Sequence, residues 1–493
     1  MRDTIVDALF GVAFVLVVLL LTVDSFTATH LTLAYLFLVA IACNQYDSRV
    51  HSGISPLLSL QIGLLFALGT GLIVLVVGGL GVRTLELVAV FALLLVFVLT
   101  RDDLPAYLPT ALPYLVACFV VVGIFLYHAR EFGAGSGLGL FPVFAGILLA
   151  FNVFVLPRYV STDAVYWTVA TVAAAVTLVG IPAALAGDYT LWIFEVRTWG
   201  GSVSIPLLDA ELSIVRSVFA NPNTFGLLAF PGTLASAVLV HRTLTRSSVP
   251  LVAVVPLCLF AITLLGTYLS NSRASMLAAA VAVAFYLLAA TDRRLVPVAV
   301  AAIALGVPAF LAAVYLSALP IDPANRFTLW RAGLEAVYRD SGLLGQGIVG
   351  TRAAIEPYLE IGGSVHNSYL SMFIRAGFLG GVAYAVLVLG PLVHGALGYA
   401  RVDTGMLALA VAFAVHQLFE GYTLFQFGHG SILGALAVGY VLVSLADGSP
   451  TAAPSENESA ATDSRSADDR GDDSILFRRE PNRTESYDYD DRL

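Results

Sequence analysis

Residues 274–290 read ASMLAAAVAVAFYLLAA, a run without a charged side chain that begins directly after Arg273. Runs of this kind, many of them close to 20 residues long, recur along most of the chain. A helix of about 20 apolar residues crosses the roughly 30 Å hydrocarbon core of a bilayer. Because backbone polar groups inside lipid must be satisfied within the segment itself, such runs form helices. The sequence therefore predicts an all-α, polytopic helical membrane protein.

The apolar runs predict about 14 transmembrane helices. The 367–398 run is unusually long, and we interpret it as a surface helix followed by a span that starts near Gly377. The predicted spans are 5–23, 30–45, 57–77, 83–100, 106–128, 138–156, 165–186, 224–241, 249–269, 274–290, 296–315, 367–398, 404–424 and 430–446.

Composition narrows the functional class. The 493 residues are 58% hydrophobic and 12% charged, about half the charged fraction of a typical soluble domain. No basic soluble domain is evident, which argues against nucleic-acid binding. The three cysteines, Cys43, Cys118 and Cys258, have no metal-ligand or disulfide spacing. All 25 basic residues are arginine and the net charge is −9, which fits either a halophilic archaeon or codon bias alone.

The C-terminal segment, residues 447–493, differs from the rest of the chain. It is rich in Asp, Ser, Arg and Glu and poor in apolar residues, so it cannot bury enough surface to fold alone. We therefore expect a transmembrane domain over 1–446 and a disordered acidic tail over 447–493.

Arginines in short loops predict the orientation, because cytoplasmic loops carry an excess of positive charge. Every second loop lies on the same side of the membrane, and most of the arginines fall in one such set of loops. Placing this set inside puts both termini in the cytoplasm of a multi-pass plasma-membrane protein. The arginines assigned to the inside are Arg2, Arg49, Arg101, Arg158, Arg242, Arg246, Arg293, Arg294 and Arg401, whereas Arg83, Arg130 and Arg197 fall outside.

This orientation leaves two long outer segments, 187–223 and 316–366. Long connections of this kind are usually functional or disordered. The apolar spacing between Arg326 and Arg339 predicts an amphipathic helix, with Phe327, Trp330, Leu334, Val337 and Tyr338 on its apolar face. Residues 316–366 are therefore expected to form a small folded cap on the outer membrane surface.

Three polar clusters fall on the same predicted outer side. Arg216 precedes Asn221-Pro222-Asn223, where Asn223 is the candidate N-cap of the next helix. Ser270-Asn271-Ser272-Arg273 joins two apolar runs, so Arg273 is held at membrane-surface depth. Arginine offers a rigid fork of donors suited to phosphate. Each cluster by itself is also explained by an interfacial arginine or a helix cap.

The third cluster is His366-Asn367-Ser368, with Arg375 two turns later. Histidine can act as a general base near neutral pH. A surface histidine beside a capping asparagine is the simpler alternative. Further along, His416 and Glu420 are four residues apart, which predicts one helix face within the 404–424 span. Ionisable groups in a membrane usually face a cavity and are often functional, although a buried pair that satisfies itself explains them too.

The order of these motifs resembles the O-antigen ligase and polymerase family of membrane glycosyltransferases over about 205–425. The matching run is Arg216…Asn221-Pro222-Asn223…Gly226, Ser270-Asn271-Ser272-Arg273, Arg326…Trp330…Gly345-Gln346-Gly347 and His366-Asn367-Ser368-Tyr369-Leu370…Gly377.

The resemblance implies a metal-independent glycosyltransferase without a cofactor that acts in polysaccharide biosynthesis at the cell envelope. Such an enzyme moves a glycan from a polyprenyl-diphosphate-linked donor in the membrane lipid to a hydroxyl of a glycan, lipid or protein acceptor on the outer face. The resemblance makes His366 the catalytic base, with Arg216 and Arg273 at the diphosphate. The expected substrate-binding residues are Asn223, Ser272, Arg326, Asn367, Arg375 and Glu420.

Two alternatives remain open at this level. A transporter or flippase of polyprenyl-linked glycans suits many helices and an intramembrane His416–Glu420 pair, although repeated halves with broken helices, common in transporters, are not evident. A structural membrane protein would need none of the three polar clusters.

Overall fold

The computed structural model describes residues 108–446 with short gaps. The four predicted spans before residue 101 and the predicted tail lie outside the described residues, as does part of the 138–156 span. The gaps are 132–144, 147–148, 160–161, 192–193, 206–209, 247–249, 319–324, 348–349, 360–362 and 427.

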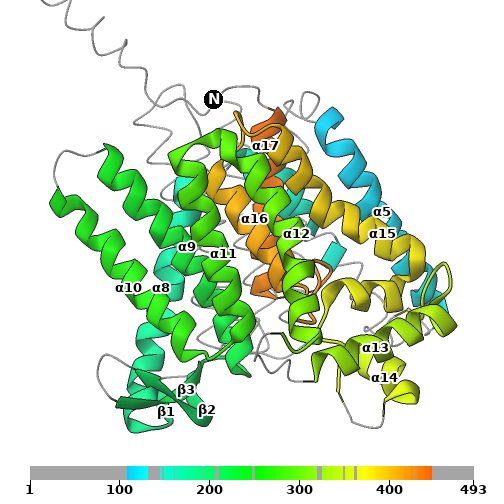
Figure 1. Cartoon of the computed structure of the whole chain (residues 1–493), viewed down its shortest axis with the longest axis horizontal. Coiled ribbons are helices and arrows are strands. Elements are labelled where there is room, and N and C mark those ends of the chain that lie inside the picture. The colour runs from blue at the N-terminus through cyan, green and yellow to red at the C-terminus, as the bar shows by residue number, and fades with distance from the viewer. Residues whose placement is uncertain are drawn as a thin grey trace, which may run out of the picture. The chain divides into compact units, whose positions relative to one another are not determined.

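Seven helices within the described part of the chain are long and apolar enough to cross a membrane, which confirms the all-α polytopic class. Two shorter apolar helices, α10 (Val254–Leu269) and α16 (Thr404–His416), stand among them (Figure 1). The seven are α5 (Leu108–Glu131), α8 (Thr162–Ala186), α9 (Pro222–Arg246), α11 (Arg273–Thr291), α12 (Val296–Tyr315), α15 (Ser368–Leu397) and α17 (His429–Ala446).

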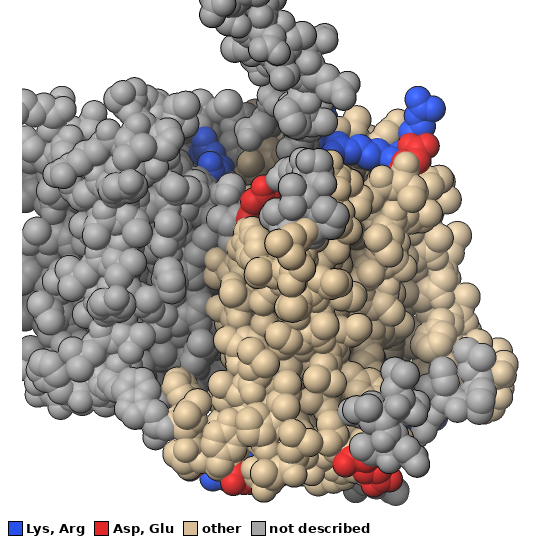
Figure 2. Space-filling view, turned by 90° about the vertical axis from the view of Figure 1, so that its left-hand side faces the viewer, with Lys and Arg blue, Asp and Glu red and all other residues tan. Residues whose placement is uncertain are grey.

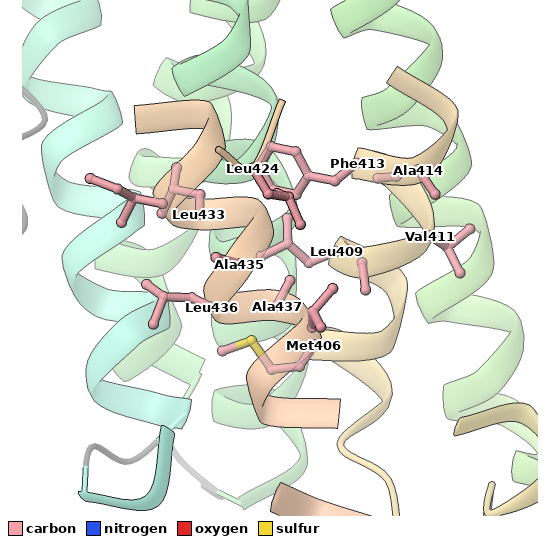
Figure 3. Close-up of a cluster of buried hydrophobic side chains, with 14 of the residues drawn as sticks. Met406, Leu409, Val411, Phe413, Ala414, Leu424, Leu433, Ala435, Leu436 and Ala437 are labelled. Atoms are coloured by element: carbon pink, nitrogen blue, oxygen red, sulfur yellow. The ribbon is translucent and has the colours of Figure 1, made fainter. Parts of the chain in front are cut away.

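The most buried helices are α16 and α17. Every residue of α16 from Gly405 to His416 is buried, and so are the first 15 residues of α17. A helix that is apolar on all sides belongs in the middle of a bundle or in lipid. Met406, Leu409 and Phe413 of α16 pack beside Leu433 and Leu436 of α17 (Figure 3). Helix α12, by contrast, has only 11% of its most apolar window buried inside the protein, so its side chains are free to face lipid.

The surface of the described residues carries its charge at two levels. Figure 2 shows Arg, Asp and Glu side chains near the upper and lower edges of one face, with an uncharged band between them. Exposed apolar side chains such as Phe119 of α5 and Leu305 of α12 lie on the long helices. Because water would penalise such a band, this surface suits a bilayer core.

Helix α15 is broken at Gly377, where the sequence predicted a surface helix to give way to a span. Gly377 has φ 67° and ψ −168°, outside helical values. The break is filled by the Gly345-Gln346-Gly347 stretch: Gln346 N–H donates to Ile374 O at 2.9 Å, and Gly347 N–H to Arg375 O at 2.8 Å. Gly345 and Gly377 meet backbone to backbone, since a Cβ on either would lie 2.3 Å from the other's nitrogen. These glycines allow the break.

The segment 187–223, which the sequence predicts on the outer side, contains a three-stranded antiparallel sheet that was not predicted. Its strands, in the spatial order β1-β2-β3, are β1 (Tyr189–Leu191), β2 (Phe194–Ile205) and β3 (Ala210–Ser217). Val215 of β3 and Ser217, whose hydroxyl donates to Val176 O at 2.9 Å, anchor the sheet on α8. The alternation of polar and apolar residues over Glu211-Leu212-Ser213-Ile214 is the local signal that was available.

The segment 316–366 forms the expected folded cap. It is built from α13 (Arg326–Ala336), the π-helical turn Val337–Ser341 and α14 (Thr351–Ile355), around a small apolar core. The predicted apolar face of the helix is partly wrong, because Leu334 and Tyr338 are 57% and 88% exposed. The face that packs inward carries Leu329, Ala332 and Ala336 instead, which are small enough to lie against Val365 and Ile374.

The predicted 404–424 span is too long. Helix α16 ends at His416, where the chain tightens: Leu418 N–H donates to Val415 O and Phe419 N–H to His416 O. His416 and Glu420 therefore do not share a helix face, and Glu420 lies in the connection to α17. The remaining short elements are Phe151–Val155 (π), α7 (Leu156–Tyr159), Pro250–Ala253, Arg293–Leu295 and Glu356–Tyr358 (each 3₁₀).

Candidate active site

The three polar clusters lie at one end of the bundle. Gly226 in the first turn of α9 packs on the 270–275 turn so closely that a Cβ there would lie 2.6 Å from Ser275 Oγ. His429 Nε2, at the start of α17, is 3.0 Å from Thr224 O. Ser368, at the start of α15, donates its hydroxyl to Glu420 O at 2.8 Å. The sheet and the cap lie at this same end (Figure 1); we call it the cap end.

The opposite end carries a different polar cluster. Arg242 of α9 is paired with Asp163 and, at 2.7 Å, with Asp403. Tyr166 donates its hydroxyl to Asp403 at 2.7 Å, and the same carboxylate caps α16 through the amides of Gly405 and Met406. Burial raises the pKa of Asp403, but Arg242 and these donors outweigh it, so the pKa lies below its ordinary value. We call this end, which holds Arg242 and Arg293 of the arginines assigned to the cytoplasm, the Arg242 end.

Arg216 sits at the end of β3, next to the turn that leads into α9. Its Nη1 donates to Ala220 O at 2.9 Å, and its Nε is buried without a partner among the described residues. Asn221, not Asn223, caps α9, because Asn221 Oδ1 accepts from Thr224 N–H at 2.9 Å. Pro222 then takes the first helical position, where its missing N–H costs nothing. The prediction that Asn223 is the N-cap was therefore wrong, because the cap lies two residues earlier.

Ser272 and Arg273 begin α11. Ser272 is the N-cap: its Oγ accepts from Ser275 N–H at 3.4 Å and from Ser275 Oγ at 2.9 Å. Asn271 has φ 48°, a left-handed conformation that asparagine tolerates. Arg273, the first helical residue, is exposed. The tight turn thus presents a guanidinium at the surface, beside the free amides of a helix N-terminus, where an anion is favoured.

His366 and Asn367 play separate parts at the start of α15. Asn367 is buried and caps the helix, with Oδ1 accepting from Leu370 N–H at 3.0 Å. His366 has φ 44°, a strained conformation for a non-glycine residue. Its side chain is 43% exposed. Surrounding contacts must hold the histidine in this geometry, and the imidazole remains open to a reactant.

Glu420 contacts two other predicted site residues, His366 and Arg326. Its carboxylate is 3.7 Å from His366 Nδ1 and 3.3 Å from Arg326 Nη2. Burial raises the pKa of Glu420, but interaction with His366 and nearby positive charge, including Arg326, outweigh it, so the pKa lies below its ordinary value. An ionised Glu420 therefore orients the imidazole and ties α13 of the cap to the connection after α16.

Arg375 lies in the first part of α15, two residues before the break. Its guanidinium stands over the Phe125 ring at 5.6 Å, and its Nε is buried with no partner in the described ranges. Gln346, in the stretch that fills the break, likewise leaves its Nε2 without one. No contact in the described residues joins Arg375 to Glu420.

Ser275 and Tyr384, two polar residues behind the site, were not among the predicted positions. Ser275 Oγ is 3.1 Å from His416 Nε2, so α11 and α16 are joined by a buried polar contact. His416 is fully buried and its ring stacks on Phe230 at 5.1 Å. Tyr384 donates to Gln417 Oε1 at 2.9 Å and accepts from Leu424 N–H, which fixes the connection carrying Glu420. For the Ser275–His416 contact, the local signal in the sequence is Ser275 itself, which lies two residues after Arg273.

Part of the chain that forms this site matches a known protein family. Residues 258–385 match the family model described as O-antigen ligase. This segment of the chain is O-antigen ligase-like. It includes Arg273, Arg326, His366 and Arg375, whereas Arg216 and Glu420 lie outside it.

The resemblance seen in the sequence is confirmed by this match, which covers roughly a quarter of the chain. The match supports a membrane glycosyltransferase of the ligase or polymerase type, with glycan and lipid-linked substrates, in a multi-pass membrane protein. No curated protein matches the chain. Within the described residues there is no group of three or more His, Cys, Asp or Glu that could hold a metal ion, and metal independence stays a prediction.

Proposed function

We propose that this protein transfers a glycan from a polyprenyl diphosphate to an acceptor hydroxyl at the cap end, which faces the outside of the cell. The single observation that carries the proposal is the Glu420 carboxylate between His366 and Arg326, at the end of the bundle that also holds Arg216 and Arg273. The donor is drawn from the membrane, and both termini and the 447–493 tail are cytoplasmic.

His366 is the base in this proposal. Glu420 holds the Nδ1 side of the ring, which leaves Nε2 to accept the proton of the acceptor hydroxyl. The freed oxygen attacks the anomeric carbon of the donor sugar, and the bond from that carbon to the diphosphate oxygen breaks. The electron pair leaves with polyprenyl diphosphate, so negative charge develops on the phosphate side.

Arg273 and Arg216 stabilise that leaving group. Preorganised cations aimed at developing charge are worth several kcal/mol in a partly dehydrated site. Three buried donors without partners in the described residues fit this role, since a diphosphate supplies only acceptors: Arg216 Nε, Gln346 Nε2 and Arg375 Nε. Ser272 and Asn367 contribute by capping, which fixes Arg273 and His366, and Asn223 lies in the first turn of α9.

The test is turnover by the purified protein in lipid nanodiscs. With a polyprenyl-diphosphate-linked glycan and its acceptor, polyprenyl diphosphate should appear in step with extended or attached glycan, and only when acceptor is present. A protein that releases none under any acceptor, while folded by its melting curve, would contradict the proposal.

A transporter of lipid-linked glycans is the competing function, and a deletion strain separates the two. The present proposal expects lipid-linked glycan to accumulate on the outer leaflet, because flipping continues while transfer stops. Accumulation on the inner leaflet would favour the transporter. In the same strain, loss of long chains indicates a polymerase and loss of attachment indicates a ligase.

A further inference from the structure

A row of four aromatic side chains lies beside the proposed catalytic group. Tyr315 at the end of α12 meets Phe327 edge to face at 5.4 Å between ring centroids, and Phe327 meets Trp330 in the same way at 5.6 Å. Trp330 is 6.1 Å from Phe419, the residue before Glu420. The row therefore runs from the lipid-facing helix α12, across α13, to the Glu420 connection. We call these four residues the aromatic row.

Two polar groups belong to or border the aromatic row: the Trp330 N–H and the Arg326 guanidinium. The Arg326 guanidinium lies 5.9 Å from the Phe419 ring centroid. Arg326 and Trp330 are four residues apart on α13 and share a face of the helix. Arg326 Nη1 and Trp330 Nε1 are both buried, and no acceptor in the described part of the chain bonds to either. A buried donor left unpaired costs about 1–3 kcal/mol and calls for an explanation.

An interfacial aromatic belt does not explain these two donors. In a belt, tryptophan places its ring in the lipid boundary and its N–H toward water or headgroups. Trp330 Nε1 is instead shielded from solvent, and no acceptor in the described residues bonds to it. Tyr315 is 68% exposed and fits a belt by itself, but Phe327, Trp330 and Phe419 are only half-buried and adjoin a carboxylate–histidine pair.

We propose that the aromatic row binds a sugar ring of the acceptor, and that the acceptor is therefore a glycan. A pyranose ring presents apolar C–H faces, which lie flat on aromatic rings, and hydroxyl oxygens at its rim, which accept from N–H donors such as Trp330 Nε1. This inference rests on the proposed function, because it assigns the acceptor side of the same site.

The position of the row separates acceptor from donor. Arg216 and Arg273 belong to β3 and α11, whereas the aromatic row belongs to α12 and α13, and Figure 1 shows the sheet and the cap on opposite sides of the cap end. Glu420 lies between them, since it touches Arg326 of α13 and its neighbour His416 touches Ser275 of α11. A diphosphate on the arginine side and a sugar on the aromatic side would meet at His366.

Binding is measured without turnover, so that the inference can fail independently of the proposed function. The protein carries His366→Ala, and the probe is the oligosaccharide pool released by mild acid from the lipid-linked glycans of the producing cells, labelled at the reducing end. Fluorescence polarisation in nanodiscs gives the affinity. The parent should bind the pool saturably, and adding Trp330→Ala should weaken binding at least tenfold. Trp330→Phe, which keeps a ring and removes the N–H, should weaken it about threefold.

Trp199→Ala is the matched control, since Trp199 is 49% exposed on β2 and lies outside the row; it should leave binding unchanged. Equal binding by the parent and the Trp330→Ala protein would overturn the inference, and so would a parent that binds no glycan. Either result would leave release of polyprenyl diphosphate by the wild type untouched. A Trp330→Ala protein that only melts earlier would assign the row to the membrane belt instead.

Discussion

The two ends of the bundle use the same kinds of side chain for different purposes. At the Arg242 end, Asp403 and Asp163 neutralise the guanidinium, and each oxygen of Asp403 has a donor. At the cap end, Glu420 is shared between His366 and Arg326, and several buried donors have no partner within the described residues. Satisfied clusters stabilise a fold, whereas several unpaired buried donors at one end are typical of a site that binds a polar ligand.

The largest effect expected from this comparison is on turnover. His366→Ala should lower kcat by about 10²–10⁴-fold, the usual contribution of general base catalysis, while the melting temperature stays near that of the wild type. The matched variant is His241→Ala, which removes a histidine that contacts Tyr286 at 2.9 Å near the Arg242 end. Equal kcat for the His366→Ala protein and the wild type would remove His366 as the base.

The next effect should be on stability at the opposite end. Asp403→Asn leaves the half-buried Arg242 with one carboxylate fewer, and breaking a pair with a buried carboxylate costs about 3–5 kcal/mol. Thermal unfolding in nanodiscs should show a large loss, with kcat per folded molecule unchanged. Glu195→Gln, which removes an exposed ion pair with Arg197, serves as the control, since such pairs contribute about 0–1 kcal/mol.

The spans, the break in α15 and the polar clusters could be predicted from the sequence, because each depends on the residues next to it in the chain. Apolar runs of sufficient length identified the described spans, and the glycine in the 367–398 run located the break in α15. The three polar clusters were found because each one interrupts or ends an apolar run. The length of an apolar run and the polar residues that interrupt it are properties of neighbouring residues, which a single sequence displays.

The errors concern features set by distant contacts. The Arg242–Asp403 pair joins residues 161 positions apart, and nothing local to either residue indicates the other. The end of α16 at His416 is fixed by Ser368 and Tyr384 of α15, which bind the following connection. The sheet in 187–223 was missed because Gly200 and Gly201 interrupt β2 and because the sheet packs on α8, where tertiary contacts outweigh propensity.

A further prediction concerns the leaving group. Arg273→Ala should raise the activation free energy by about 2–4 kcal/mol, as for other charge-stabilising donors. Steady-state kinetics with donor and acceptor both varied should place the loss in kcat and in kcat/KM for the donor. Arg331→Ala, a second arginine at the same end but on α13, should change little. A loss confined to the acceptor KM would reassign Arg273 to acceptor binding.

The smallest expected effect is the pH dependence of the cap contact. The pKa of Glu420 is below its ordinary value of 4.5 in the folded protein, so its ionised form stabilises the fold at pH values above about 4.5, and the contribution disappears as the pH falls below that value. The melting temperatures of the wild type and the Glu420→Gln protein should therefore differ at pH 7 and converge as the pH falls through the lowered pKa of Glu420. A constant difference across this range would exclude the ionised contact.

The most direct measurement is photocrosslinking with a polyprenyl diphosphate glycan that carries a diazirine on its first sugar, in nanodiscs containing the His366→Ala protein. Both sides of the site should be labelled, in peptides around 216–226, 270–276, 326–330 and 366–370, and Arg273→Ala should reduce all four together. Labelling concentrated around 240–246 and 400–406, at the Arg242 end, or spread along both ends alike, would contradict a single donor site at the cap end.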